Sequence, residues 1–268
     1  MSRLAVALAP LVLAVSAFSE TALRDLQATS IDGLQGAVPN ANIVQGRGSA
    51  NSVNVFIRGI GQPDALQTFD PGVGMYVDDV YYSRINGALF SLFDVSQVEV
   101  LRGPQGTLYG KNSTGGAIKV NTKNPFDHEG GSAEITLGDY GRKEGRVYFS
   151  GKLSETVAAS IAAAKITNDG YVENRAGGDD FNDDDTEALR LKLAFNPSDS
   201  FRATLAFDHT RQDAGLTMGR PMAALQQKEL NTGAVVKILQ PASTGDWDHS
   251  AETSFSPDKG QELKHYGT

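Results

Sequence analysis

The stretch best suited to do chemistry is a glycine-rich loop, VEVLRGPQGTLYGKNSTGG, at residues 98–116. A phosphate-binding loop needs Gly, four residues and then Gly-Lys-Ser/Thr, with a strand before it and a helix after it. Here Gln105 stands five residues before Gly110, Asn112 occupies the Ser/Thr position, and the segment after Gly116 alternates like a strand. The spacing argues against nucleotide binding and favours a tightly folded loop whose glycines supply positive φ angles.

No other group of residues has catalytic or metal-binding spacing. The chain has no cysteine, and its four histidines are far apart and lack a nucleophile partner. The acidic run at 179–185 begins like a calcium loop, but Asp185 stands where an EF-hand has glycine. We therefore predict no catalytic residue, no metal site and no cofactor, and we expect the run to be a solvated acidic loop.

Composition and the N-terminus limit the partners. The net charge is -8, the pI is about 5.0, and the basic residues are scattered, so we expect no nucleic acid partner. Arg3 precedes an apolar run at 4–15, and Val-Ser-Ala at 15–17 fits the cleavage site of a secretory signal, although an apolar strand fits equally well. No other run reaches the roughly 18 apolar residues of a membrane helix, so a membrane role would have to use strands or a surface.

Residues 19–125 mix helical and strand patterns. A helix is predicted after Ser19, where apolar residues recur on one face, and a second short helix is predicted from Thr29 with a capping box. A strand is predicted at 53–57 and a tight hairpin at 75–82. The glycine-rich loop then runs from one strand to the next. This order predicts a compact α+β domain.

Residues 126–268 have a different character. Leucine and phenylalanine alternate with other residues at 189–195 and 201–207, which puts an apolar and a polar face on each strand. Short turns alternate with long polar loops, the longest at 168–185 and 212–260. Outer-membrane barrels are built this way, from tilted strands of about 9–11 residues. A soluble sandwich also alternates, but its connections are typically about 2–6 residues long.

Together these segments resemble one family. VNVFIRGIG (53–61), GVGMYVDDVYY (72–82) and VEVLRGPQGTLYGKNSTGGAIKVNTKNP (98–125) are similar, in order and spacing, to the plug domain of TonB-dependent outer-membrane receptors. The later strands, including DGYVENR (169–175), resemble the first barrel strands of the same family.

The resemblance implies three parts: an apolar leader at 1–18, which is signal-like or the first plug strand, an α+β plug domain at 19–125, and antiparallel all-β strands of an incomplete transmembrane β-barrel at 126–268. Family members import large, scarce nutrients such as ferric siderophores across the bacterial outer membrane, through a barrel of about 22 strands with a plugged lumen. The implied partners are outer-membrane lipid, the TonB energy-transducing complex and an iron chelate or other nutrient. No enzymatic activity and no cofactor are implied.

The resemblance also implies roles for single residues. Arginines in the IRG and LRGP motifs, here Arg58 and Arg102, fasten the plug to glutamates of the barrel wall in this family; an ordinary surface position is the alternative for each. Tyr76, Tyr81 and Tyr82 are candidates for a ligand-facing surface, with core packing as the competing interpretation. The residues assigned to the plug loop are Gly103, Pro104, Gly106, Tyr109, Gly110, Gly115 and Gly116.

The chain departs from the family pattern in two ways. About a dozen residues precede the first plug-like strand, and none suggests a TonB-contacting segment, which leaves energy coupling unassigned. About six strands fit between residues 131 and 268, too few to close a wide barrel, so we expect the N-terminal part of a longer protein. The alternative is a stand-alone periplasmic or secreted β-rich protein that binds a ligand without transport.

Overall fold

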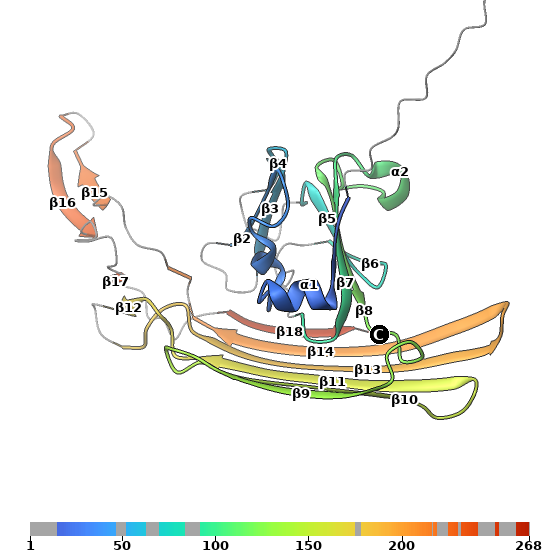
Figure 1. Cartoon of the computed structure of the whole chain (residues 1–268). Helices are drawn as coiled ribbons and strands as arrows, with labels where there is room; N and C mark the ends of the chain where they lie inside the picture. The colour runs from blue at the N-terminus through green and yellow to red at the C-terminus, as the bar shows by residue number, and fades with distance from the viewer. Residues whose placement is uncertain are drawn as a thin grey trace, which may run out of the picture.

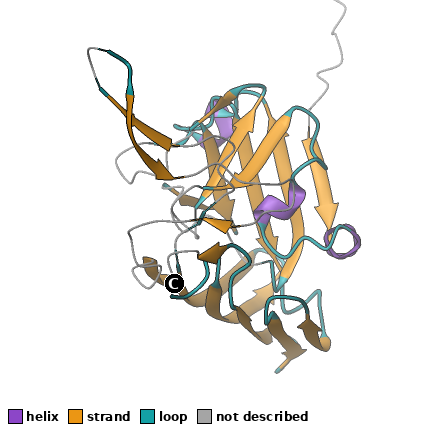
Figure 2. Ribbon diagram, turned by 90° about the vertical axis from the view of Figure 1, so that its left-hand side faces the viewer, coloured by secondary structure: helices purple, strands orange, loops and turns teal. Residues whose placement is uncertain are grey.

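The computed structural model shows a mixed domain, here called the plug, above a curved sheet, here called the wall (Figures 1 and 2). The plug comprises the described residues up to 122, and the wall begins at residue 130. The structure describes residues 15–46, 52–62, 70–83, 92–174, 178–215, 217–218, 225–229, 232–240, 250–251 and 261–267.

The central sheet of the plug consists of β1 (Val15–Ser19), β5 (Val73–Val77), β6 (Val80–Tyr82), β7 (Val95–Arg102) and β8 (Gly116–Thr122). Its spatial order is β1-β7-β8-β5-β6. Strand β7 is antiparallel to both neighbours, whereas β5 and β8 are parallel. One face of the sheet carries the main core, in which Val98, Val100 and Ile118 are fully buried.

Short elements cover this core: α1 (Glu20–Asp25), the 3-10 helix η1 (Ile31–Leu34), and a small sheet of β2 (Ala41–Gln45), β3 (Val53–Ile57) and β4 (Ile60–Gly61). The hydroxyl of Ser19 accepts the N–H of Ala22 at 3.3 Å, which confirms the predicted start of the first helix. The second helix was predicted to start at Thr29, but η1 starts at Ile31 and its N-cap residue is Ser30. The hydroxyl of Ser30 donates to the carboxylate of Asp32 and does not cap the helix backbone.

The predicted hairpin and the strand-to-strand loop are both confirmed. Asp78 and Asp79 have φ values of 46° and 69°, the left-handed conformation of a type I′ turn between β5 and β6. The loop between β7 and β8 contains a short helix that was not predicted, α2 (Gly106–Tyr109). At Gly116 (φ 151°) an added Cβ would lie 2.2 Å from the carbonyl oxygen of Leu101, so only glycine allows β8 to start there.

The wall consists of β9 (Gly130–Leu137), β10 (Lys143–Lys152), β11 (Val157–Asn168), β13 (Asp184–Ser198), β14 (Phe201–Ala214) and β18 (Gln261–Gly267). These six strands form one antiparallel open sheet in the order β18-β14-β13-β11-β10-β9. The predicted alternation is confirmed: Leu191 and Leu193 are 40% and 44% exposed, whereas Lys192 and Ala194 are 7% and 1% exposed. The fold is therefore an α+β plug followed by the antiparallel strands of an incomplete barrel.

Connections differ between the two ends of the wall. The β10–β11 and β13–β14 turns are short and lie at the right in Figure 1. At the opposite end, long segments follow β11 and β14, and they hold β12 (Glu173–Asn174), β15 (Leu225–Lys228), β16 (Val235–Gln240) and β17 (Ser250–Ala251). The β9–β10 turn at that end is short. In the described ranges, no helix combines the length and apolar character needed to cross a membrane.

The acidic run at 179–185 is only in part the solvated loop expected from the sequence, since Asp179 and Asp185 are exposed but the residues between them are not. Phe181 is fully buried within it and pairs with Val172. The carboxylate of Asp183 accepts the backbone N–H of Gly215 at 2.7 Å. The burial of one aromatic side chain thus draws neighbouring acidic residues into fixed hydrogen bonds.

Candidate functional site

The plug meets the wall with one end of its central sheet (Figure 1). Because β5 and β8 are parallel and β7 opposes them, the ends of β5 and β8 lie beside the start of β7. Asp78 follows β5, Asp94 precedes β7 and Thr122 ends β8; we call these three residues the acidic end. At the opposite end of the sheet, Arg102 closes β7 and Arg58 follows β3; we call these two residues the arginine end.

Lys192 of β13 enters the acidic end. Its ammonium lies 2.9 Å from the carboxylate of Asp78, donates to the hydroxyl of Thr122, and lies 3.4 Å from the carbonyl oxygen of Lys123. The carboxylate of Asp78 also accepts the backbone N–H of Thr122 at 2.8 Å. Burial by itself would raise the pKa of Asp78, but the charge of Lys192 and these hydrogen bonds outweigh it and hold the pKa below its usual value.

Arg190, two residues earlier on β13, binds the second carboxylate. Its guanidinium forms ion pairs with Asp94 of the plug and Asp208 of β14. It also lies over the ring of Phe93, 5.2 Å from the ring centroid. Asp94 is 3% exposed, and this burial raises its pKa while the charge of Arg190 opposes the rise. Both cations of β13 thus form ion pairs with carboxylates of the plug.

The strand pattern explains how β13 reaches the plug. Residues two apart on a strand face the same side, so Arg190 and Lys192 both point inward. The neighbouring strand β11 places Ala162 opposite Arg190 and Ser160 opposite Lys192. These small side chains leave room for the plug to approach the wall, and Ala162 is buried beneath it.

A weaker set of contacts lies on β10. Arg146 donates to the carbonyl oxygen of Leu92 at 3.4 Å and pairs with Glu144 of its own strand. The hydroxyl of Tyr148 donates to the carbonyl oxygen of His128 at 3.2 Å. These two bonds join the wall to backbone carbonyl oxygens of the plug and of the segment between plug and wall. They therefore do not depend on the charge of any plug side chain.

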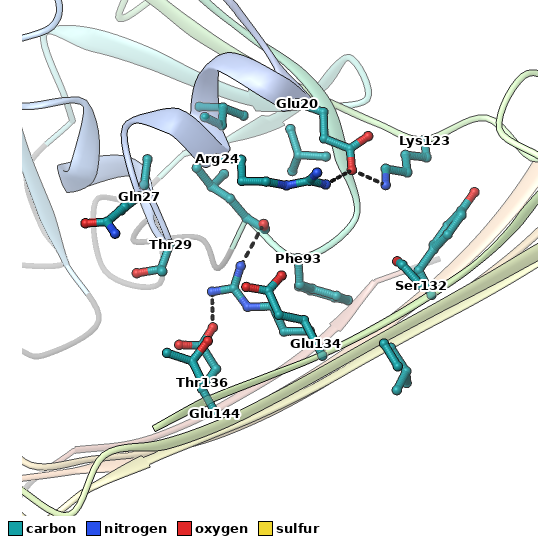
Figure 3. Close-up of a pocket in the computed structure, with 18 of the residues that line it drawn as sticks. Glu20, Arg24, Gln27, Thr29, Phe93, Lys123, Ser132, Glu134, Thr136 and Glu144 are labelled. Carbon is teal, nitrogen blue, oxygen red and sulfur yellow. Dashed lines mark hydrogen bonds and ion pairs between the residues drawn. The ribbon is translucent and has the colours of Figure 1, made fainter. Parts of the chain in front are cut away.

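A cavity of about 860 Å³ lies between α1 and the first two wall strands (Figure 3). Glu20 lies at one side, 3.2 Å from the guanidinium of Arg24 and 2.7 Å from the ammonium of Lys123. At the wall side, Glu144 pairs with Arg142 at 2.8 Å and with Arg146. Most of the acidic and basic side chains that line this cavity are thus paired with one another. Among the described residues, no three metal-ligating side chains cluster there or elsewhere.

The arginine end has no carboxylate partner within the described residues. Arg102 donates to the carbonyl oxygen of Pro39 at 3.4 Å, and its Nε is buried without a hydrogen-bond partner there. Arg58 is exposed, and an added Cβ on Gly103 would lie 3.4 Å from its guanidinium. The two predicted locking residues therefore lie at one end of the plug, and their pairing with wall glutamates stays a prediction.

The predicted plug-loop residues form a loop that is closed by its own hydrogen bonds. The N–H of Gly103 donates to the carbonyl oxygen of Gly115 at 2.9 Å. The hydroxyl of Ser113 donates to the carbonyl oxygen of Gly110 at 2.7 Å. Pro104, Gly106 and Gly116 complete the loop between the two strands, together with Tyr109 at the end of α2. One bond also joins the loop to the segment before β5: the N–H of Gly115 donates to the carbonyl oxygen of Gly72 at 2.9 Å.

The three candidate tyrosines lie in two places. Tyr76 is 5% exposed, and its ring centroid lies 5.3 Å from that of Tyr81 and 5.0 Å from that of Tyr109. Its hydroxyl donates to the carbonyl oxygen of Tyr109 at 2.7 Å. Tyr82 packs against the main core instead. Packing accounts for these contacts, and a ligand-facing role stays a prediction.

Sequence reasoning did not identify the residues that join plug and wall: Asp78, Asp94, Thr122, Arg190 and Lys192. The available signal was weak. Long basic side chains on the inward face of an amphipathic strand next to a predicted plug suggest a partner, but the alternation does not say which residues pair.

Comparisons with known proteins agree with this architecture. Residues 10–117 match the family model described as TonB-dependent Receptor Plug Domain. The pesticin receptor of Yersinia pestis is 31% identical over 199 residues, which cover 72% of this chain and 29% of the receptor. A vitamin B12 transporter, BtuB of Vibrio vulnificus (strain CMCP6), is 29% identical over 140 residues, 51% of this chain and 22% of the transporter. The chain thus spans less than a third of the length of these curated relatives.

Solved structures show the same fold. The ferric yersiniabactin uptake receptor FyuA from Yersinia pestis has a TM-score of 0.68 and 25% identity, over 85% of this chain and 35% of that protein. The ferripyoverdine receptor of the outer membrane of Pseudomonas aeruginosa has a TM-score of 0.66 over 95% of this chain and 30% of that protein; its 18% identity supports the fold alone. These relatives are receptors and transporters, not enzymes. From the matched plug, the sequence relatives and the shared fold together, we conclude that the chain belongs to the TonB-dependent receptors of the bacterial outer membrane.

Proposed function

We propose that this chain supplies the plug and the first wall strands of a receptor that imports a large, scarce nutrient across the outer membrane. One observation carries the proposal: a folded domain is seated on the polar face of a sheet whose other face exposes apolar side chains. A wide lumen needs such a stopper, and movement of the stopper would gate passage.

The outer face of the wall is suited to lipid. Its exposed apolar residues include Phe149, Ile161, Leu191, Leu193 and Leu205, with Leu205 65% exposed. On a sheet in water such a face would be an aggregation hazard, whereas in a bilayer it matches the hydrocarbon. Strands β9 and β18 each have a free edge among the described strands, so we expect further wall strands to pair with them in the membrane.

A ferric siderophore is the first candidate nutrient. The solved relatives include a ferric yersiniabactin uptake receptor and a ferripyoverdine receptor, and another relative is a vitamin B12 transporter. The test is uptake of radiolabelled ferric siderophore and of cobalamin by cells in which this receptor is the sole route, with and without a functional TonB complex. TonB-dependent uptake of either compound would support transport, and the compound taken up would identify the nutrient class. Uptake of neither would contradict the proposal.

Fractionation tests the alternative function directly. A heat-modifiable species in outer membranes is expected for a barrel, because closed barrels resist unfolding in cold detergent. Recovery of a soluble 28.5 kDa monomer from the periplasm would support the stand-alone ligand-binding protein instead.

We also propose that the arginine end locks the plug. Guanidinium groups bind carboxylates in a bidentate manner, and the buried, unpartnered Nε of Arg102 shows that its donors are not fully used by the described residues. In the assembled receptor, Arg102→Ala should make the outer membrane leakier to large antibiotics. Arg24→Ala is the matched control, since its side chain is 71% exposed and, among the described residues, forms an ion pair with Glu20 alone. Equal antibiotic permeability in the two variants would contradict the lock.

A further inference from the structure

We infer that the acidic end is a second plug anchor, opposite in charge to the arginine end: wall cations of β13 hold plug carboxylates. Lys192 binds Asp78, and Arg190 binds Asp94. The inference concerns how the plug is seated and does not depend on which nutrient is imported.

The partners of Lys192 are the first step. An ammonium group has three donors, and the three acceptors near this one are the Asp78 carboxylate, the Thr122 hydroxyl and the Lys123 carbonyl. All three precede the first wall strand. The side chain is 5% exposed and makes none of these bonds within the wall. A buried cation on a wall strand whose hydrogen bonds all go to the plug and to the residue that follows it has an anchoring role and no role in the sheet itself.

Arg190 extends the anchor to a second plug residue. It divides its guanidinium between Asp94 of the plug and Asp208 of the wall, and Phe93 of the plug covers it. The groups that face one another are thus two cations of β13, two plug carboxylates and one wall carboxylate. Removal of Arg190 leaves the carboxylate of Asp94, which is 3% exposed, without its ion-pair partner, and this is strongly unfavourable. The side chain of Asp78 is 37% exposed, so removal of Lys192 leaves a carboxylate that water reaches in part.

The same wall offers a contrasting lysine. Lys165 of β11 also bonds to two carboxylates, Asp185 and Glu187, but both lie on β13. Its side chain is 46% exposed, so water screens these pairs. Lys165 and Lys192 therefore share their chemistry and differ in burial and in the domain they contact.

The anchor is complete within the described chain. Its residues lie between Asp78 and Asp208, in the plug and in the wall strands that follow it. The plug can therefore be seated on β13 without any contact to the arginine end.

Hydrogen exchange on the full chain in detergent micelles tests this inference. Lys192→Met should speed exchange of the N–H groups of Asp78 and Thr122, which close the acidic end, by at least about tenfold. Lys165→Met should leave both unchanged. Equal exchange in the two variants would overturn the anchor.

A charge exchange separates anchoring from packing. Lys192→Glu should release the acidic end, and Asp78→Lys added to it should restore slow exchange of the N–H of residue 78, which donates to the carbonyl oxygen of Val120, because the pair is then rebuilt with opposite polarity. The N–H of Thr122 does not serve as the readout in this variant, since its acceptor is the carboxylate of Asp78. Lys192→Arg keeps the charge and should retain slow exchange, which provides a readout should Lys192→Met fail to fold. Failure of both the exchanged pair and Lys192→Arg to protect the acidic end would overturn the inference. Uptake is not measured, so this outcome is independent of the proposed transport.

Discussion

The two ends of the plug sheet carry opposite charges and differ in how they are satisfied. At the acidic end, Asp78 and Asp94 are bound by wall cations within the chain. At the arginine end, Arg58 and Arg102 have no carboxylate partner among the described residues. A reversed plug would place Arg58 and Arg102 against Arg190 and Lys192 of β13, so the charges favour the observed orientation of the plug on this strand.

The largest expected effect comes from Arg190→Ala. It removes the guanidinium that pairs with both Asp94 and Asp208, which should lower the free energy of unfolding by about 3–5 kcal/mol. Denaturant unfolding of the chain in detergent measures this. The control is Arg24→Ala at an exposed pair, where we expect about 0–1 kcal/mol. Similar losses in both variants would remove the distinction between buried and exposed pairs.

A smaller effect should follow from strain beside the arginine end. Gly116→Ala forces a Cβ within 2.2 Å of the carbonyl oxygen of Leu101, so we expect a loss of about 1–3 kcal/mol and faster exchange at Arg102, which pairs with residue 116. Gly106→Ala is the matched control, because an added Cβ there meets nothing within 4 Å. The acidic end should stay protected in both variants; its release by Gly116→Ala would show that the two ends are coupled.

The two ends should also respond differently to acid. The pKa of Asp78 is lowered in the folded state, so its contribution to stability is present above the unfolded pKa of about 3.9 and is lost as pH falls through the folded value. The protection of the Thr122 N–H, measured against its intrinsic exchange rate at each pH, should therefore fall below about pH 4. Asp78→Asn should abolish this dependence. Asp78 does not contact the arginine end, so a parallel loss of protection at Arg102 would contradict the assignment.

The smallest effect is expected for Arg102→Ala in this chain. Its one described partner is the carbonyl oxygen of Pro39 at 3.4 Å, so the loss should be about 1 kcal/mol or less in unfolding experiments. A loss as large as that of Arg190→Ala would mean that the arginine end is already anchored within this chain.

Local sequence patterns predicted much of this architecture. Period-two alternation assigned the apolar face of β13 and β14, and the hairpin at 75–82 and the strand-to-strand glycine loop formed as expected. These features depend on residues close in sequence, whose side chains alternate between faces for steric reasons. The motif at 98–125 placed the chain in its family because its order and spacing extend over many residues.

Tertiary structure alone decided which charges meet. Lys192 and Asp78 are 114 residues apart, and Arg190 and Asp94 are 96 residues apart. Alternation shows that both cations face inward, but their partners depend on where β5, β7 and β8 end and on the small residues of β11 that let the plug approach. Local sequence therefore sets which side chains lie on each face of a strand, whereas packing of the plug on the wall sets the charge pairs, because a buried charge takes its partner from the domain that packs against it.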